Sequence, residues 1–306
     1  MTDKDEIRMS YSSMSEMHSC EMKYAHRKIF KSNVDVDITQ DTTALRVGSC
    51  FHFVLEICKH DYSLVTDQNR KDAFKRYEIE DISQQGLLIA LWEKYQKLHT
   101  ASGLTVIACE EDIGDYRVVG SIDVVLQDRR GYWFICDLKT ASQFSTVKFA
   151  RLNKDRQLNL YTYFRGQVAE KYSLDLDMFA GVIYRVALKS RKKIYAKETL
   201  DSYVKRLENE VEIKDVFIPI DKLEPKDAYD DIINAQRRAM LIKQGDEKPI
   251  KNFASCEAWF RPCNYFSQCH GHLHSEGAKL FPERTDWNMS PYVIENTDKE
   301  LEDLGL

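Results

Sequence analysis

Two strand-like stretches joined by a short turn constrain the fold of this chain more than any other feature. An apolar-rich run over residues 116–126 leads into a turn at residues 128–131, and residues 132–136 form the return run. This pattern predicts an antiparallel hairpin. Asp123 lies on the first strand and Asp137 directly follows the return run. Pairing of the two strands can therefore place the two carboxylates side by side.

Lys139 adds a cation to the same strand. It lies two residues after Asp137, and residues two apart on a strand point to the same face of the sheet. Two carboxylates and one lysine on one face can hold a divalent cation and activate a water molecule for phosphodiester cleavage. An Asp-x-Lys triplet alone is common, so an ordinary charged surface hairpin is the alternative. The longer pattern, which begins at Gly120 and ends at Thr140, is more specific.

This arrangement resembles the PD-(D/E)xK nuclease superfamily, and its flanking residues resemble the RecB-like branch with the CRISPR-associated and phage exonucleases. The resemblance covers residues from about 10 to 270. It implies that Asp123 and Asp137 bind Mn²⁺ or Mg²⁺, with the backbone carbonyl of Leu138 as a further ligand. It also implies that Lys139 assists the attacking water. The implied fold is a restriction-endonuclease-like α/β core, with a mixed central sheet flanked by helices.

A helix-like stretch upstream carries a second part of the resemblance. Gly48, His52 and Glu56 are spaced four residues apart, and they match the G-x-x-x-H-x-x-x-E element of RecB-like nucleases. The family's histidine is a metal ligand, which implies the same for His52. A neutral imidazole beside two carboxylates suits Mn²⁺. A lone histidine on an amphipathic helix is otherwise usually structural, and Glu56 either binds the metal or only orients a neighbour.

Residues 156–164 are predicted to form a helix downstream of the hairpin, with Gln157 and Tyr161 on one face. They match the family's Q-x-x-x-Y motif, which implies that they position the DNA strand near the cleavage site. A buried helix with a polar edge is the alternative. Basic residues within 148–156 and 189–193 either contact phosphates or form a solvated surface.

Eight cysteines give a second, separate signal. Four of them lie inside apolar runs and are expected to be small buried residues: Cys50, Cys58, Cys109 and Cys136. The other four resemble the iron–sulfur members of the RecB-like family, in which one N-terminal and three C-terminal cysteines bind a [4Fe–4S] cluster. The corresponding residues are Cys20, Cys256, Cys263 and Cys269.

The match to the iron–sulfur members has departures. Cys20 lies in a stretch similar to the family's opening motif, S-x-S-x-L-x5-C-P-x-x-Y. Met14 stands in place of its Leu and Glu21 in place of its Pro. The C-terminal spacing is C-x6-C-x5-C, whereas the best-known members have C-x-x-C-x5-C, so only the last interval agrees. Zinc is an alternative, because four thiolates suit tetrahedral Zn²⁺ and histidines between residues 270 and 274 follow directly. Three free cysteines in a loop-rich tail are the remaining alternative.

The bulk properties exclude several classes of protein. The chain has 306 residues, enough to bury a large core, and it is 43% hydrophobic and 30% charged, as in soluble globular proteins. No apolar run approaches the ~20 residues that span a bilayer, and the polar, acidic start is unlike a signal peptide. We therefore expect a cytoplasmic protein of a bacterium or a phage-infected cell, without a membrane partner. The net charge of −5 disfavours DNA binding only mildly, since a nuclease needs a local basic groove.

Three parts are predicted along the chain, together forming one compact domain. They are a helical N-terminal part (1–100), a nuclease core (101–245) and a C-terminal cysteine-containing segment with a tail (246–306). Apart from the hairpin, strands are predicted at 104–109, 179–188, 194–195 and 216–220, and helices at 78–100, 150–170, 201–210 and 226–243.

These features predict a metal-dependent DNA exonuclease that acts on single-stranded ends. Its expected setting is phage or bacterial recombination, repair or CRISPR spacer processing, with a helicase or a recombination or CRISPR protein as a partner. A catalytically silent DNA-binding or scaffold protein on the same fold is the first alternative, and the intact set of Asp123, Asp137 and Lys139 argues against it. A site-specific endonuclease is the second alternative, but no recognition domain is visible in the sequence.

Overall fold

The computed structural model describes residues 7–32, 43–258 and 261–270. These residues form two compact units. Residues 7–31 and 43–252 belong to the first, and residues 32, 253–258 and 261–270 belong to the second. The predicted histidine ligands at positions 272 and 274 lie outside the described residues. The three-part division of the chain stays a prediction.

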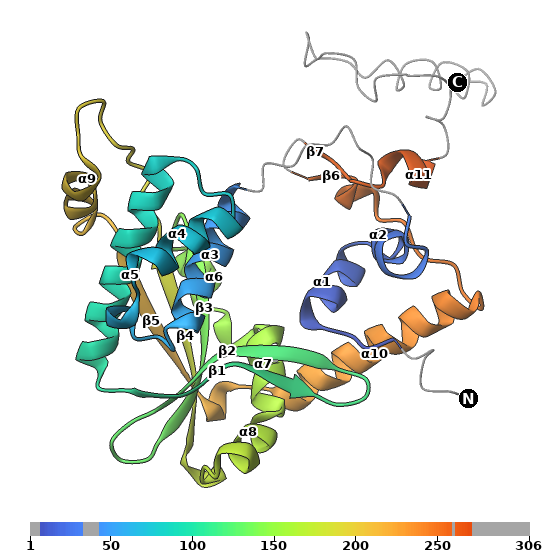
Figure 1. Ribbon diagram of the computed structural model, residues 1–306. Coiled ribbons are helices and arrows are strands. Elements are labelled where there is room, and N and C mark those ends of the chain that lie inside the picture. Colours follow the sequence, from blue (N-terminus) through green and yellow to red (C-terminus); the bar gives the residue numbers. More distant parts are fainter. Residues whose placement is uncertain (1–6, 33–42, 259–260, 271–306) are drawn as a thin grey trace. The chain divides into compact units, whose positions relative to one another are not determined.

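A five-stranded mixed sheet in the order β1-β2-β3-β4-β5 forms the centre of the first unit (Figure 1). Neighbouring strands are antiparallel except β3 and β4, which run parallel. The strands are β1 (Thr105–Gly114), β2 (Val119–Gln127), β3 (Trp133–Ala141), β4 (Phe179–Leu188) and β5 (Glu212–Pro219). The prediction of a mixed α/β fold is confirmed.

The predicted hairpin is the β2–β3 pair. Val124 lies opposite Cys136 in the antiparallel register, and both side chains are fully buried. The turn is stabilised by Asp128, whose Oδ1 accepts the backbone N–H groups of Arg130 and Tyr132, each at 2.9 Å. Gly131 in this turn has φ = 90°, a conformation that glycine adopts without steric cost.

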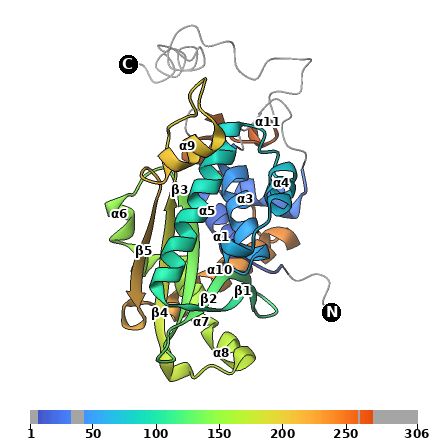
Figure 2. The same cartoon turned by 60° about the vertical axis from the view of Figure 1, so that its left-hand side comes forward.

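Helices cover one face of the sheet through a hydrophobic cluster that includes Leu138 of β3 and Ala187 of β4. Fully buried Trp92, Tyr95 and Tyr203 are the largest side chains that these helices contribute. The helix α5 runs lengthwise over the sheet with α3 and α4 beside it (Figure 2). The helices of this layer are α3 (Thr43–Ile57), α4 (Asp67–Arg76), α5 (Ile82–Ser102) and α9 (Leu200–Leu207).

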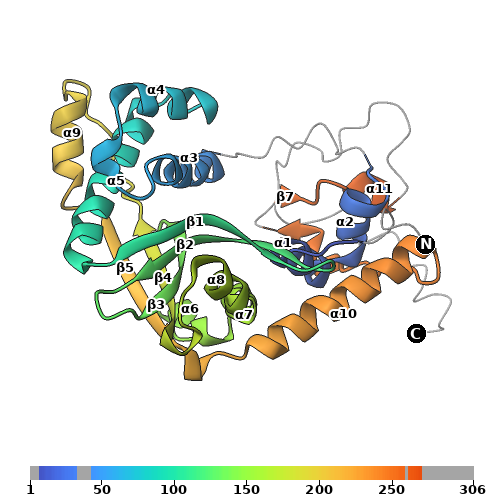
Figure 3. The same ribbon diagram turned by 60° about the horizontal axis from the view of Figure 1, so that its bottom comes forward.

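A second helical layer covers the opposite face, so that the sheet lies between two sets of helices (Figure 3). Ile135 of β3 and Val182 of β4 belong to this larger cluster, together with Leu158 and Ile232 from the helices. The helices of this layer are α1 (Tyr11–Ser19), α7 (Arg156–Tyr163), α8 (Arg165–Tyr172) and α10 (Pro225–Gln244). Shorter helices are α2 (Glu21–Tyr24), a π-helix (Ala25–Ile29), α6 (Thr146–Phe149) and 3₁₀ turns at Tyr62–Leu64, Leu152–Lys154, Leu176–Met178 and Ile220–Lys222.

Three predicted elements differ from the structure. Residues 194–195 are not a strand, because the backbone N–H of Ile194 donates to Ser83 Oγ of α5 at 3.3 Å and β4 pairs with β5 instead. The predicted single helix over 150–170 is divided at Phe164, whose φ and ψ of −88° and 8° separate α7 from α8. The first strand continues past residue 109 to Gly114.

The described part of the second unit contains a two-stranded antiparallel sheet, β6 (Glu257–Ala258) and β7 (Arg261–Pro262), followed by α11 (Phe266–His270); a 3₁₀ turn, Phe253–Ser255, precedes it. The backbone N–H of Cys263 donates to the carbonyl of Cys256 at 2.7 Å. The hairpin therefore brings the backbones of these two cysteines together. No helix in the described ranges of either unit is long and apolar enough to cross a membrane.

Candidate active site

A cavity of about 610 Å³ lies between α3 and the strands of the first unit. Gly48 lets α3 approach β3 closely, since a Cβ at this position would lie 3.1 Å from Thr140 Oγ1. This close approach brings the side chains of one face of α3 to the middle of the sheet. The charged and titratable residues of the cavity wall are His52, Glu56, Glu110, Asp123, Lys139 and Lys189.

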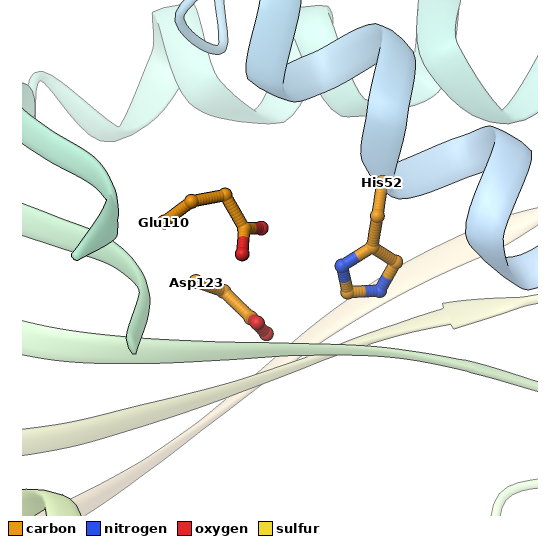
Figure 4. Close-up of side chains that lie close together, drawn as sticks. All are labelled: His52, Glu110 and Asp123. Atoms are coloured by element: carbon orange, nitrogen blue, oxygen red, sulfur yellow. The ribbon is translucent and has the colours of Figure 1, made fainter. Parts of the chain in front are cut away.

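His52, Glu110 and Asp123 form a group that can hold a metal ion. One ligand atom from each residue lies within 4.8 Å of the others, and the three side chains point toward one another from α3, β1 and β2 (Figure 4). Glu110 lies between Cys109 and Glu111, which pair with Val124 and Ile122, so it stands opposite Asp123. One nitrogen and two carboxylate ligands are a suitable set for Mn²⁺ or Mg²⁺.

The backbone of Leu138 links this group to β3. Its N–H donates to Asp123 Oδ2 at 2.6 Å, and the His52 side chain lies close to its backbone. The hydrogen bond fixes the orientation of Asp123, a candidate metal ligand. The predicted hairpin geometry therefore brings Asp123 to the start of the Asp-x-Lys segment.

Asp137 and Lys139 form an ion pair at the same place. Lys139 Nζ lies 2.7 Å from Asp137 Oδ1, so the two side chains share one side of β3, as the two-residue spacing predicted. Asp137 is fully buried, and its Oδ2 has no hydrogen-bond partner among the residues that the structure describes. A buried carboxylate oxygen without a partner is costly. Asp137 Oδ2 is therefore a candidate metal ligand.

A comparison of the sequence with models of known protein families is consistent with a site of this kind. The sequence model of the PD-(D/E)XK nuclease superfamily matches residues 8–270. The chain belongs to the PD-(D/E)XK nuclease superfamily. Members of this superfamily typically use a divalent metal ion, and the cavity contains residues of the required types.

Two solved structures are similar to this PD-(D/E)XK protein. One is a candidate exonuclease from Eubacterium rectale, with 15% identity, a TM-score of 0.45, and coverage of 80% of this chain and 84% of that one. The other is a phage-related exonuclease from Haemophilus somnus 129PT, with 11% identity, a TM-score of 0.29, and coverage of 64% and 93%. A comparison with curated proteins finds no match.

The charge states of the site suit a PD-(D/E)XK metal centre. Burial, followed by the nearby Lys139 cation, lowers the pKa of His52 to about 4, so the imidazole is neutral and able to bind a metal at neutral pH. Burial and the neighbouring Asp123 raise the pKa of Asp137 to about 7, although Lys139 opposes this shift. Burial and the charges of Asp123 and Glu56 raise the pKa of Glu110 to about 7. A divalent cation would relieve this crowding of negative charge.

The predicted Gln157–Tyr161 pair lies beside the same site. Gln157 Nε2 donates to Tyr161 Oη at 2.6 Å on α7. Burial raises the pKa of Tyr161, and the carboxylates of Asp137 and Asp123 raise it further, because they lie close to the phenol. The structure therefore brings both motif residues to the carboxylates from the face opposite α3.

Glu110 is the one candidate ligand that the sequence analysis did not find. The predicted strand ended at Cys109, and Glu110 was one of three consecutive acidic residues after it. In the structure Glu110 has φ = 47°, in the left-handed region that non-glycine residues rarely adopt. Such strain is often found at functional sites. The acidic run at the end of a strand was the only signal available, since sequence does not reveal a left-handed residue inside a strand.

The four predicted cluster cysteines belong to different units. Cys20 lies between α1 and α2 in the first unit and is 7% exposed. Cys256, Cys263 and Cys269 lie in the second unit, between residues 253 and 270. Cys20 and the three C-terminal cysteines thus belong to separate units, and a cluster that they share stays a prediction.

Proposed function

We propose that this protein is a metal-dependent DNA exonuclease that hydrolyses phosphodiester bonds, with Asp123, Asp137 and Lys139 as its catalytic residues. The proposal is supported by membership of the PD-(D/E)XK nuclease superfamily. The observation that carries it is a cavity wall that joins a His–Glu–Asp group with Lys139, whose ion-pair partner Asp137 is a buried carboxylate with an unused oxygen among the described residues.

Mn²⁺ or Mg²⁺ is the proposed cofactor. His52, Glu110 and Asp123 would hold it, with Asp137 Oδ2 and the carbonyl of Leu138 as further ligands. The bound ion would neutralise charge on the scissile phosphate and lower the pKa of a water molecule. The ligand set favours these two ions, because it combines carboxylate oxygens with a single imidazole and contains no thiolate.

Lys139 has the role of orienting the attacking water and stabilising the charge that develops on the phosphate. Its position supports this role. The side chain is 35% exposed at the cavity wall, while its carboxylate partner is fully buried. Burial lowers the pKa of Lys139, but the adjacent Asp137 and Asp123 raise it by more, so the ammonium stays protonated. Gln157 and Tyr161 would position the DNA strand beside it.

The narrower assignment to the RecB-like exonucleases is also a proposal. It is supported by the Gly48–His52–Glu56 element, which lines the cavity. It is also supported by Tyr161 of the Gln157–Tyr161 element, because its phenol lies close to the carboxylates of Asp137 and Asp123. The expected substrates are single-stranded DNA ends in phage or bacterial recombination, repair or spacer processing, with a helicase or a recombination or CRISPR protein as a partner.

A [4Fe–4S] cluster at Cys20, Cys256, Cys263 and Cys269 is proposed as a second cofactor, with Zn²⁺ as the alternative. The hydrogen bond between the backbones of Cys263 and Cys256 supports a metal-binding hairpin in the second unit. Protein purified without oxygen should be brown, with broad visible absorbance, and should lose its colour in Cys263→Ser. Colourless protein with stoichiometric zinc would favour the alternative.

The nuclease proposal is tested with 5′- and 3′-labelled single- and double-stranded DNA, incubated with Mn²⁺, Mg²⁺ or a chelator. Wild-type protein should degrade DNA only when a divalent metal is present, and the order of label release gives the polarity. Lys139→Ala should bind DNA but leave it intact. Undiminished metal-dependent cleavage by Lys139→Ala would contradict the assignment. Binding without cleavage by the wild type would favour a silent DNA-binding scaffold.

A further inference from the structure

The wall of the active-site cavity carries both acidic and basic side chains. His52, Glu110 and Asp123 form one group (Figure 4), and Lys139 and Lys189 are the two cations among the residues that line the cavity. Lys139 is already paired with Asp137 at 2.7 Å. Of these two lysines, only Lys189 has no ion-pair partner among the described residues.

Lys189 has a fixed backbone and an unpaired side chain. Its N–H donates to the carbonyl of Ala141 at 2.8 Å, which ties the residue after β4 to the end of β3. Within residues 7–32, 43–258 and 261–270, its ammonium has no ion pair and no side-chain hydrogen bond. Burial alone lowers the pKa of Lys189, without a contribution from any neighbouring charge. The carboxylates of the site thus do not compensate this cation.

The position of Lys189 along the sheet separates it from the candidate metal ligands. Lys139 pairs with Val186 in the parallel register of β3 and β4. Lys189 lies three residues beyond Val186, which is about 10 Å further along the strand direction. Lys189 therefore lies further along the sheet than Lys139 and than Asp137, which pairs with Tyr184.

A partly buried cation without a counter-ion is unfavourable, and binding of an anion removes that cost. A nucleic-acid strand carries one phosphate per nucleotide, so a strand cut beside Lys139 continues with further phosphates along the cavity. We infer that Lys189 binds a phosphate next to the scissile one and thereby fixes the register of the strand; this inference rests on the proposed nuclease function.

Other basic residues of the same loop differ from Lys189. Lys192 pairs with Glu210 at 2.6 Å. Lys193 is exposed and does not line the cavity. Lys193 is therefore a matched control, because its loss removes the same charge from the same loop but leaves the cavity unchanged.

The experiment compares Lys189→Gln, Lys189→Arg and Lys193→Gln with the wild type on a labelled single-stranded oligonucleotide. Steady-state cleavage with Mn²⁺ gives KM and kcat. Fluorescence anisotropy in the presence of a chelator gives the dissociation constant at several salt concentrations, without cleavage. Lys189→Gln should raise KM about tenfold, as expected for the loss of one charge-assisted phosphate contact, and should change kcat by less than about twofold. The slope of log Kd against log salt should fall by about 0.7, the value for one phosphate contact to a single strand.

Lys189→Arg should retain most of the wild-type affinity, and Lys193→Gln should behave as the wild type. Equal KM and equal salt slope for Lys189→Gln and Lys193→Gln would overturn the inference while the nuclease function stands. If the wild type binds DNA but cleaves nothing with either metal, the proposed function fails. The slope of log Kd against log salt for Lys189→Gln then tests, independently of cleavage, whether Lys189 contacts a phosphate. An unchanged slope would overturn it as well.

Discussion

Two ion pairs, each with one fully buried partner, lie on adjacent strands of the same sheet, and they differ in how completely their hydrogen bonds are formed. Arg185 of β4 is fully buried and binds Asp215 of β5 through two hydrogen bonds, at 2.8 and 2.7 Å. It also donates to Tyr95 Oη at 3.2 Å, and Tyr95 in turn contacts His60 Nδ1 at 2.7 Å. Both oxygens of this carboxylate are satisfied.

The pair on β3 is incomplete. Asp137 is fully buried, but only its Oδ1 is used, by Lys139. Its Oδ2 has no partner among the described residues. Leu138, the residue between these two, lies directly beside Arg185 in the register of β3 and β4. Neighbouring positions of one sheet therefore hold one pair whose carboxylate is fully hydrogen-bonded within the protein and another whose carboxylate has an unused oxygen among the described residues.

This difference separates structural from functional buried charge. A complete pair fixes the arrangement of its strands, and removing one partner leaves a buried charge uncompensated. An incomplete pair destabilises the fold unless a cation binds. We expect mutations of the first pair to change stability, and mutations of the second pair to change activity.

Asp137→Asn should have the largest effect on activity. It keeps the shape of the side chain but removes the charge that holds the metal, so cleavage should fall by at least about 10³-fold. The melting temperature without metal should remain within a few degrees of the wild type, because a buried negative charge is also removed. Cleavage of labelled DNA and thermal unfolding measure the two effects on the same preparation. A large loss of stability would show that Asp137 is structural after all.

Arg185→Met should have the next largest effect, on stability. The free energy of unfolding should fall by about 3 kcal/mol, at the lower end for a broken buried pair, because the Asp215 side chain is 31% exposed. Denaturant unfolding measures this change. Arg130→Met is the control, since its pair with Asp128 is 80% exposed on the arginine side and should contribute less than about 1 kcal/mol. An Arg185→Met protein that is as stable as the wild type but inactive would contradict the structural role of this pair.

Metal binding should tighten about tenfold or more between pH 6 and pH 8. The pKa values of Asp137 and Glu110 are both raised to about 7, so a metal must displace protons at pH 6 but not at pH 8. The same shifts contribute to the stability of the metal-free protein; this contribution is fully present below about pH 4 and is lost as pH rises through about 7. Equilibrium dialysis of Mn²⁺ at each pH measures the affinity. Glu110→Gln should weaken the pH dependence, and an unchanged profile would exclude Glu110 as a ligand.

Tyr161→Phe should have the smallest effect. It removes the hydroxyl that accepts a hydrogen bond from Gln157 at 2.6 Å. One such bond contributes about 1 kcal/mol, so kcat/KM should fall about fivefold. Tyr163→Phe on the same helix is the control, because Tyr163 stacks on Tyr229 by its ring. Equal kcat/KM values of the two variants would exclude a role of Tyr161 in positioning the DNA.

Much of the fold was predictable because the sequence carries local signals for it. Alternating apolar residues and the turn at residues 128–131 predicted the hairpin, and β4 agrees with the predicted range of 179–188. The helix at 226–243 was found within one residue at each end, since Pro225 and Gly245 mark its limits. The strand at 194–195 was wrong, because a tertiary hydrogen bond to Ser83 decides that backbone.

Contacts within the candidate site were predictable only for residues that a sequence motif holds at a fixed spacing. Asp137 and Lys139 share one strand, and their contact follows from their separation of two residues. Glu110 begins an acidic run and Lys189 begins a basic run, but neither pattern indicates which residue of the run reaches the cavity. Glu110 depends on a left-handed residue inside β1, and Lys189 on the parallel pairing of β3 with β4. Both are consequences of tertiary structure.

Calorimetric titration of Mn²⁺ into the metal-free protein at pH 8 tests the central claim most directly. The wild type should bind Mn²⁺ stoichiometrically at the site formed by His52, Glu110 and Asp123, and folded Asp123→Asn should show no such binding. Stoichiometric binding that persists unchanged in Asp123→Asn would contradict the account, because the cation would then occupy a different site.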